Sequence, residues 1–224
     1  MSMPNNNSWI TAIICLLATS QTLDAREVKS VATPDLTLSA ALAAVPSENR
    51  GRAIFEKRCA QCHQNDAHGL GKQHIPALAG QQYSYLVKQL IDLVSFDRAN
   101  NTMHEVLVKS GVSDTRSIAD VAAYVANLPE NPSPDRGNGL SMALGKTVFE
   151  GACVSCHSKK ADGNDDLWIP TLRGQHYEYL LIQMQSMAAG RRNNVSEDLH
   201  QIFTAYAPQE LEAVADYISR INAL

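Results

Sequence analysis

Cys59-Ala60-Gln61-Cys62-His63 and Cys153-Val154-Ser155-Cys156-His157 are two copies of one five-residue pattern, C-x-x-C-H. This pattern is typical of covalent attachment of a c-type haem. A short turn of helix presents two thiols to the two vinyl groups of one porphyrin, and the histidine that follows is placed under the iron. Each stretch therefore predicts one haem c group. The predicted attachment residues are Cys59, Cys62, Cys153 and Cys156, and the predicted proximal iron ligands are His63 and His157.

A structural zinc site or a pair of redox-active C-x-x-C motifs is the alternative interpretation of these cysteines. Zinc sites usually bring their two cysteine pairs within about 15–20 residues of each other. Here the pairs begin 94 residues apart, and each is followed by its own histidine. The spacing therefore favours two haem sites over one zinc site.

Composition narrows the class of protein. The chain has 224 residues, enough for one large domain or two of about 100 residues each. Its formal net charge is -4, and no basic face with interleaved aromatic residues is present, so we expect no nucleic-acid partner. Four of the five cysteines belong to the two motifs, and only Cys15 remains. The mature chain is therefore expected to hold no spare thiolate that could act as a nucleophile or as an iron ligand.

Residues 1–25 have the character of a secretory signal peptide. An apolar run from Trp9 to Ala18 is followed by small and polar residues, and it is too short to span a bilayer comfortably. The usual basic segment is absent, because no lysine or arginine precedes Arg26. We expect cleavage after Ser20 or Ala25. Membrane association through an uncleaved N-terminus or through a partner is the alternative.

An internal repeat relates the two halves of the chain at an offset of 94 residues. The run Ile75-Pro76-x-Leu78-x-Gly80-Gln81-x-Tyr83-x-Tyr85-Leu86 recurs from Ile169 to Leu180. The repeat predicts two domains of one fold. The expected boundaries are a signal peptide at 1–25, an N-terminal extension at 26–48, and domains at 49–131 and 132–224.

The spacing of apolar residues predicts helices in both halves and no strands. A first helix, near residues 49–58 or 141–152, leads into each haem motif. The second and last helices carry one apolar face each, formed by Leu86, Leu90, Leu93 and Val94, and by Ile118, Val121, Ala122 and Val125, with matching residues in the second half. The predicted fold is all-α, with a proline-rich linker at 128–139. The alanine-rich run at 38–44 fits either a short helix or an extension.

Taken together, these features resemble the diheme cytochrome c4 family, periplasmic carriers made of two class I cytochrome c domains. The resemblance covers residues 49–224 and rests on the paired motifs and the repeated Pro-x-Leu-x-Gly-Gln-x-x-x-Tyr-Leu run. It implies that the carbonyl groups of Pro76 and Pro170 accept hydrogen bonds from His63 and His157, which fixes each ring and raises its basicity. It also implies a close crossing of first and last helices, with Gly51 and Phe55 against Tyr124, and Gly145 and Phe149 against Tyr217.

The sixth iron ligand departs from the resemblance. The family uses a methionine before the last helix, whereas the runs here are Met103-His104-Glu105-Val106-Leu107 and Leu199-His200-Gln201-Ile202-Phe203. No methionine follows Met187, whose spacing places it in the core. We therefore predict His104 and His200 as distal ligands. Met103 is the alternative at the first haem, and ordinary polar residues at a helix start are the alternative for both histidines.

The other histidines have no imidazole counterpart in the opposite half. His68 and His176 are expected at solvated loop or helix-start positions, and His74 beside its haem. Arg98 and Arg192 precede the distal histidines. Each arginine is expected either to pair with a haem propionate or to lie in a solvated loop.

An iron with both axial positions filled by protein has no open site for a substrate. The sequence therefore predicts an electron-transfer protein of the periplasm, which meets redox partner proteins through small, transient contacts. Imidazole in place of a thioether predicts a lower reduction potential. The alternatives are a diheme enzyme of the peroxidase or thiosulfate-oxidising type, and a cytochrome subunit of a larger redox complex.

Overall fold

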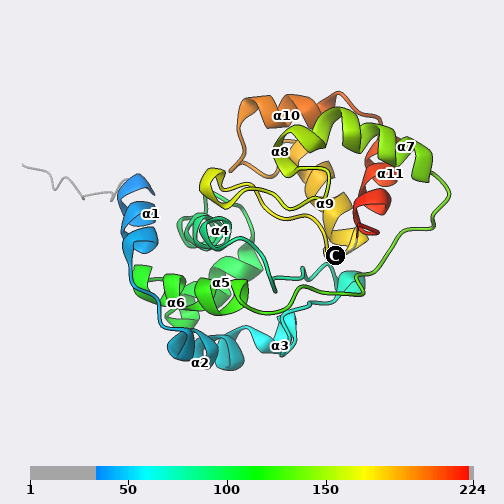
Figure 1. Ribbon diagram of the computed structural model, residues 1–224. Helices are drawn as coiled ribbons and strands as arrows, with labels where there is room; N and C mark the ends of the chain where they lie inside the picture. Colours follow the sequence, from blue (N-terminus) through cyan, green and yellow to red (C-terminus); the bar gives the residue numbers. More distant parts are fainter. Residues whose placement is uncertain (1–33, 222–224) are drawn as a thin grey trace, which may run out of the picture. The chain divides into compact units, whose positions relative to one another are not determined.

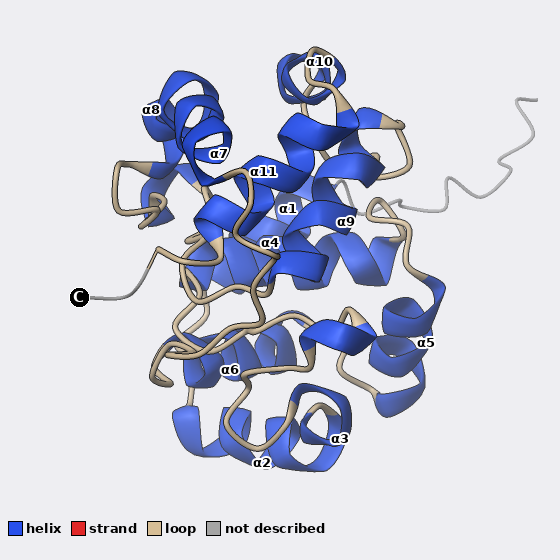
Figure 2. Ribbon diagram, turned by 90° about the vertical axis from the view of Figure 1, so that its right-hand side faces the viewer, coloured by secondary structure: helices blue, strands red, loops and turns tan. Residues whose placement is uncertain are grey.

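The computed structural model describes residues 34–221 of the chain, which belong to one compact unit of helices joined by loops (Figures 1 and 2). Among the described residues, the β-structure is limited to two isolated antiparallel bridges, Leu70 with Ile75 and Asn164 with Ile169. These bridges are themselves related by the offset of 94 residues. The predicted all-α fold is confirmed.

The predicted signal peptide and the first part of the N-terminal extension lie outside the described residues. In the part of the chain that is described, no helix combines the length and the apolar character needed to cross a membrane.

The helices of the two halves follow the same order. In the first half they are α1 (Pro34–Ala43), α2 (Glu48–Arg58), α3 (Ala60–His63), the 3-10 turn η1 (Gly71–Gln73), α4 (Tyr83–Ser95), α5 (Asn101–Ser110) and α6 (Thr115–Ala126). In the second half they are α7 (Met142–Val148), the π-helical turn η2 (Phe149–Cys153), α8 (Val154–His157), the 3-10 turn η3 (Asp165–Leu167), α9 (Tyr177–Ala188), α10 (Glu197–Thr204) and α11 (Pro208–Ile218).

Each half has its own hydrophobic core, formed by the predicted apolar faces. In the first half, α4 and α6 bury Leu86, Leu93, Ile118, Val121 and Val125. In the second half, α9 and α11 bury Leu180, Met184, Met187, Leu211, Val214 and Ile218. Both α2 and α3 lie at the bottom of Figure 1, α7 and α8 at the top, and α4 and α9 between them. The two cores therefore support the two haem motifs separately.

The crossing of first and last helices is as close as the repeat implies. A Cβ atom at Gly51 would overlap the carbonyl oxygen of Asp120 on α6. At the same level the rings of Phe55 and Tyr124 pack with their centroids 5.7 Å apart. In the second half a Cβ atom at Gly145 would overlap the carbonyl oxygen of Ala213, and the rings of Phe149 and Tyr217 lie 5.6 Å apart. The expected contacts are confirmed, and they fix each haem-motif helix on its core.

Two local features differ between the halves. The first helix of the second half does not run unbroken to Ala152 as expected, because α7 ends at Val148 and a π-helical turn follows. Gly151 lies in that turn, where the first half has Lys57. In the first half, the alanine-rich run forms part of α1, whose Leu38 and Ala41 are buried against α4 and α6. The N-terminal extension thereby adds to the first core.

Candidate functional site

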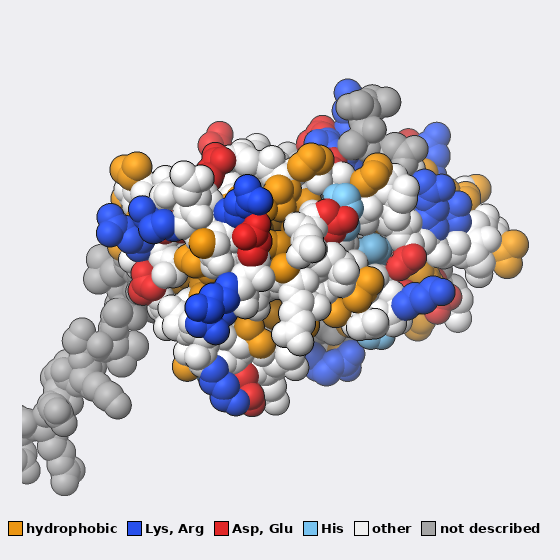
Figure 3. Space-filling model, turned by 90° about the horizontal axis from the view of Figure 1, so that it is seen from below, with side chains coloured by type: hydrophobic (Ala, Val, Ile, Leu, Met, Phe, Trp, Pro, Cys, Tyr) orange, Lys and Arg blue, Asp and Glu red, His pale blue; other side chains and the backbone are white. Residues whose placement is uncertain are grey.

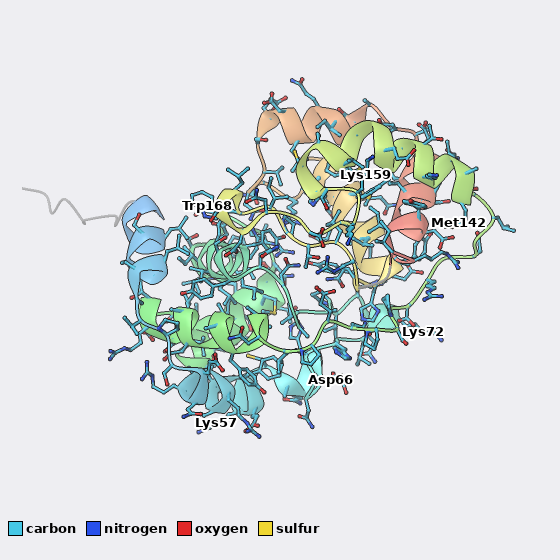
Figure 4. All side chains as sticks on the ribbon, viewed as in Figure 1. Lys57, Asp66, Lys72, Met142, Lys159 and Trp168 are labelled. Carbon is cyan, nitrogen blue, oxygen red and sulfur yellow. The ribbon has the colours of Figure 1, made fainter. Side chains whose placement is uncertain are left out.

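Each C-x-x-C-H motif forms one turn that continues its first helix. The amide of Cys59 donates to the carbonyl of Phe55 at 2.8 Å, and the amide of His63 donates to the carbonyl of Cys59 at 2.9 Å. In Figure 4, Lys57 near the end of α2 and Lys159 just after α8 mark the two motifs at the bottom and the top of the view. Both cysteines and the histidine of a motif therefore project from a single turn.

The four motif cysteines form no disulfide bond, so all four sulfur atoms are available for attachment. Cys59 and Cys153 are partly buried, while Cys62 and Cys156 are exposed. Burial, and to a smaller extent the neighbouring motif cysteine, raises the pKa of the Cys59 and Cys153 thiols to about 11. In the unmodified chain these two side chains are therefore protonated at neutral pH.

The motif histidines are held by the loop that follows them. His63 donates from Nδ1 to the carbonyl oxygen of Pro76 at 3.2 Å, and His157 donates from Nδ1 to the carbonyl oxygen of Pro170 at 2.9 Å. Burial lowers the pKa of both imidazoles, and the hydrogen bond to the proline carbonyl offsets part of this effect. Each ring is thus a neutral imidazole with its proton on Nδ1, which leaves the Nε2 lone pair free to bind a metal.

His104 and His200 are held in the same manner on α5 and α10. His104 donates from Nδ1 to the carbonyl oxygen of Leu93 at 3.0 Å. His200 donates from Nδ1 to the carbonyl oxygen of Met187 at 2.7 Å. Leu93 and Met187 are equivalent positions of the repeat, on α4 and α9. Both rings therefore have a fixed tautomer with a free Nε2.

The helix caps keep these two histidines equivalent although the preceding loops differ in length. The repeat offset rises from 94 residues at Arg98 to 96 residues at His104. Asn100 caps α5 by accepting from the amide of Met103 at 3.0 Å, and Ser196 caps α10 by accepting from the amide of Leu199 at 3.3 Å. Each histidine follows its cap by four residues. The extra residues of the second half are thus absorbed in the loop.

Met103 packs against the first core, as its counterpart Leu199 packs against the second. Met187 is buried in the second core, where the sequence places it, and it is 8% exposed. The side chains of Met103, the alternative ligand, and of Met187 thus both contact the hydrophobic cores.

The two arginines join the halves of the chain. Arg98 donates to the phenol oxygen of Tyr179 at 2.8 Å, and Arg192 donates to that of Tyr85 at 3.1 Å. Both guanidinium groups also donate to the side-chain oxygens of the equivalent residues Gln89 and Gln183. Both arginines lie in loops, as expected, but the alternative of solvated side chains is wrong, because both guanidinium groups are engaged in hydrogen bonds across the boundary between the two domains.

This arginine pair places two positive charges between the halves, and the buried carboxylate of Asp92 lies near enough to favour the charged form of Arg98. Burial alone would raise the pKa of the Tyr85 phenol, but the charges of Arg192 and Arg98 hold it below its usual value. Among the described residues, the hydrogen-bond partners of the two guanidinium groups are phenols, side-chain amides and no carboxylate. Such a pair suits an anionic group, as a haem propionate would be.

His176 departs from the expectation of a solvated side chain. It is the N-cap residue of α9, at a helix start as expected, but it is buried. Its Nδ1 accepts from the amide of Asp135 at 3.0 Å, and its Nε2 donates to the carbonyl oxygen of His68 at 2.7 Å. Both ring nitrogens are therefore used in contacts within the protein. His74 lies exposed at the end of η1.

The donor set of each half fits a covalently bound haem. Two thiols and an imidazole come from one turn, a second imidazole with a free Nε2 comes from α5 or α10, and an arginine comes from the loop before it.

Charges on the face in Figure 3 are interspersed, with Lys and Arg side chains lying beside Asp and Glu side chains.

Comparison with known proteins agrees with the internal duplication. The family model for cytochrome c matches this chain twice, over residues 48–129 and 142–222. The cytochrome c4 of Azotobacter vinelandii is 27% identical over 180 residues, which cover 73% of this chain and 84% of that protein. A thiosulfate dehydrogenase electron acceptor from Stutzerimonas stutzeri is 31% identical over 177 residues, which cover 73% of this chain and 79% of that protein.

A solved structure has the same fold. Reduced recombinant cytochrome c4 from Pseudomonas stutzeri matches with a TM-score of 0.71 at 24% sequence identity. The match covers 80% of this chain and 100% of that chain. The tandem arrangement of two class I domains is thereby confirmed.

Proposed function

Because this chain belongs to the cytochrome c family and, within it, to the diheme cytochromes c4, we propose that it transfers electrons through two haems, each with two histidine ligands. Two covalently bound haem c groups and an electron-transfer function follow from the family. The proposal assigns individual residues to them. The attachment residues are Cys59 and Cys62 for haem 1 and Cys153 and Cys156 for haem 2; the axial ligands are His63 and His104, and His157 and His200.

One observation carries the assignment of the distal ligands. All four histidines donate from Nδ1 to a backbone carbonyl, so their Nε2 atoms are the free ones. Such a hydrogen bond is usual for metal-binding histidines, because it fixes the ring and raises its basicity. His200 supports the same role for His104, because the second half offers leucine where the first has Met103.

Histidine ligation on both sides determines what the protein can do. Haem supplies one-electron chemistry at its iron, and the protein sets the potential through the axial ligands and their hydrogen bonds. With His104 and His200 on the distal sides, no coordination position is left for a substrate. The chain therefore acts as a carrier and not as a peroxidase, and imidazole ligation gives it a lower potential than methionine ligation would.

The partners are redox proteins that bind briefly. The relative named as an electron acceptor of thiosulfate dehydrogenase makes a thiosulfate-oxidising enzyme one candidate donor for this chain. Mixing such an enzyme and thiosulfate with the oxidised protein should reduce both haems within the turnover time of the enzyme. Absence of reduction would exclude this donor. We place this exchange in the periplasm, where a chain with a cleaved signal peptide would meet it.

Absorption spectra of two variants show whether His104 or Met103 is the distal ligand of haem 1. Oxidised wild-type protein is expected to lack the weak red-edge absorption band of sulfur-to-iron charge transfer. Met103→Ala should leave both haems low-spin, because its side chain packs in the core and does not bind iron. His104→Ala should turn haem 1 high-spin. A sulfur band in the wild type that persists in His104→Ala and disappears in Met103→Ala would contradict the assignment.

A further inference from the structure

Two buried glutamines, one from each half of the chain, contact the opposite half. Each bonds to the proline loop there, which is the loop that contains Pro76 in the first half and Pro170 in the second. Gln175 accepts from the amide of Ala77 at 3.0 Å and donates to the carbonyl oxygen of Ala77 at 2.9 Å. Gln81 accepts from the amide of Thr171 at 2.9 Å and donates to the carbonyl oxygen of Thr171 at 3.0 Å. Gln81 and Gln175 are equivalent in the repeat, as are Ala77 and Thr171. The contacts therefore form a reciprocal pair.

The peptide groups at these contacts also hold the proximal histidines. The amide of Ala77 and the carbonyl of Pro76 belong to one peptide group, and that carbonyl accepts from Nδ1 of His63. On the other side, the amide of Thr171 shares a peptide group with the carbonyl of Pro170, which accepts from Nδ1 of His157. A chain of two hydrogen bonds therefore runs from each glutamine, through one peptide group, to the proximal histidine of the opposite half.

Hydrogen bonds on the two sides of a peptide group strengthen each other. An acceptor placed on the amide draws the proton outward and makes the carbonyl oxygen more negative. A more negative carbonyl is a better acceptor for the imidazole Nδ1, and this makes the ring a more basic ligand. A more basic ligand favours the oxidised iron. Low local dielectric makes the effect larger at this site, because Gln81, Gln175, Ala77 and Thr171 are all buried.

We propose that each domain sets the potential of the haem in the other domain: Gln175 lowers the potential of haem 1 through Ala77 and Pro76, and Gln81 lowers that of haem 2 through Thr171 and Pro170. The two glutamines are positioning residues, since each acts through the backbone. The inference rests on the proposed proximal ligation by His63 and His157. It does not depend on which residues bind on the distal side.

Each glutamine is expected to act only on the haem of the opposite domain. This distinguishes the proposal from a role in holding the domains together. If the glutamines served only to hold the two domains together, loss of either would weaken the whole boundary and would affect the two haems alike. In the proposal, a change in the second half alters haem 1 alone, and a change in the first half alters haem 2 alone. Gln82 provides a matched control, because its side chain also crosses between the halves but donates to the carbonyl oxygen of Asp162 at 2.8 Å.

The experiment is a redox titration of the diheme protein followed by NMR, in which the signals of each axial histidine identify its haem. At a given solution potential, Gln175→Met should raise the ratio of reduced to oxidised haem 1 roughly threefold. This is equivalent to a rise of about 30 mV in the reduction potential of haem 1 for one electron, and haem 2 should be unchanged. Gln81→Met should do the reverse, and Gln82→Met should change neither haem. Gln175→Glu keeps an acceptor opposite the Ala77 amide, now charged, and should shift haem 1 in the opposite direction.

Amide exchange in the same proteins gives a readout that does not involve iron. Loss of the glutamine acceptor should speed exchange of the Ala77 amide in Gln175→Met, and of the Thr171 amide in Gln81→Met, by roughly fivefold. Faster exchange with unchanged potentials, or equal shifts of both haems, would overturn the proposal. If the rings of His63 and His157 gave no iron-bound signals in the wild type, the proposed ligation itself would fail, which is a separate outcome.

Discussion

His200→Ala is expected to turn haem 2 high-spin while haem 1 stays low-spin. The second half offers no sulfur ligand after Met187, and both nitrogens of His176 are engaged elsewhere. Removal of the His200 ring therefore leaves an open axial position on one iron. The spectrum of the oxidised protein should show about half of the haem as high-spin, and added imidazole should restore the low-spin form.

This variant should also gain a reaction that the wild type lacks. An open ferric haem binds peroxide, whereas an iron with two protein ligands has no position for it. We expect His200→Ala to bind cyanide and to turn over peroxide much faster than the wild type. His74→Ala is the matched control, because His74 is exposed and should leave both spectra unchanged. A low-spin second haem in His200→Ala would show that another residue is the distal ligand.

Gly145→Ala is expected to destabilise the protein by about 3 kcal/mol, through the crossing of α7 and α11. The added Cβ atom would overlap the carbonyl oxygen of Ala213 and press on the Cβ atom of Tyr217, so the helices must move apart. Alanine is favoured over glycine in a helix by about 1 kcal/mol, and the overlap must exceed this gain. Denaturant unfolding of the diheme protein, followed by circular dichroism, measures the difference in the free energy of unfolding.

Gly151→Ala tests the same change without the crossing. A Cβ atom at Gly151 meets nothing within 4 Å, so this variant should unfold within about 0.5 kcal/mol of the wild type. Gly51→Ala should behave like Gly145→Ala, because its Cβ atom would overlap the carbonyl oxygen of Asp120. Equal stability of Gly145→Ala and Gly151→Ala would contradict a role of close helix crossing in holding the haem motif.

The haem motifs, the duplication and the helices could be predicted from the sequence because each is a local pattern. A C-x-x-C-H turn needs only five neighbouring residues, and the apolar faces of α4 and α6 follow from helical spacing. The repeat adds a second copy of every position, which is how His104 and His200 could be paired despite loops of different length. The family confirms the two haem domains, while the distal ligands remain a prediction.

Only the tertiary structure decided how the two halves meet. Arg98 with Tyr179, Gln175 with Ala77 and His176 with His68 are contacts between residues 81 to 108 positions apart in the chain. Their side chains are polar, and a polar residue in a sequence is most simply placed in solvent. Burial of these groups becomes favourable only when the opposite domain supplies the matching donor or acceptor. That match depends on the relative placement of two domains, which no local pattern in either half determines.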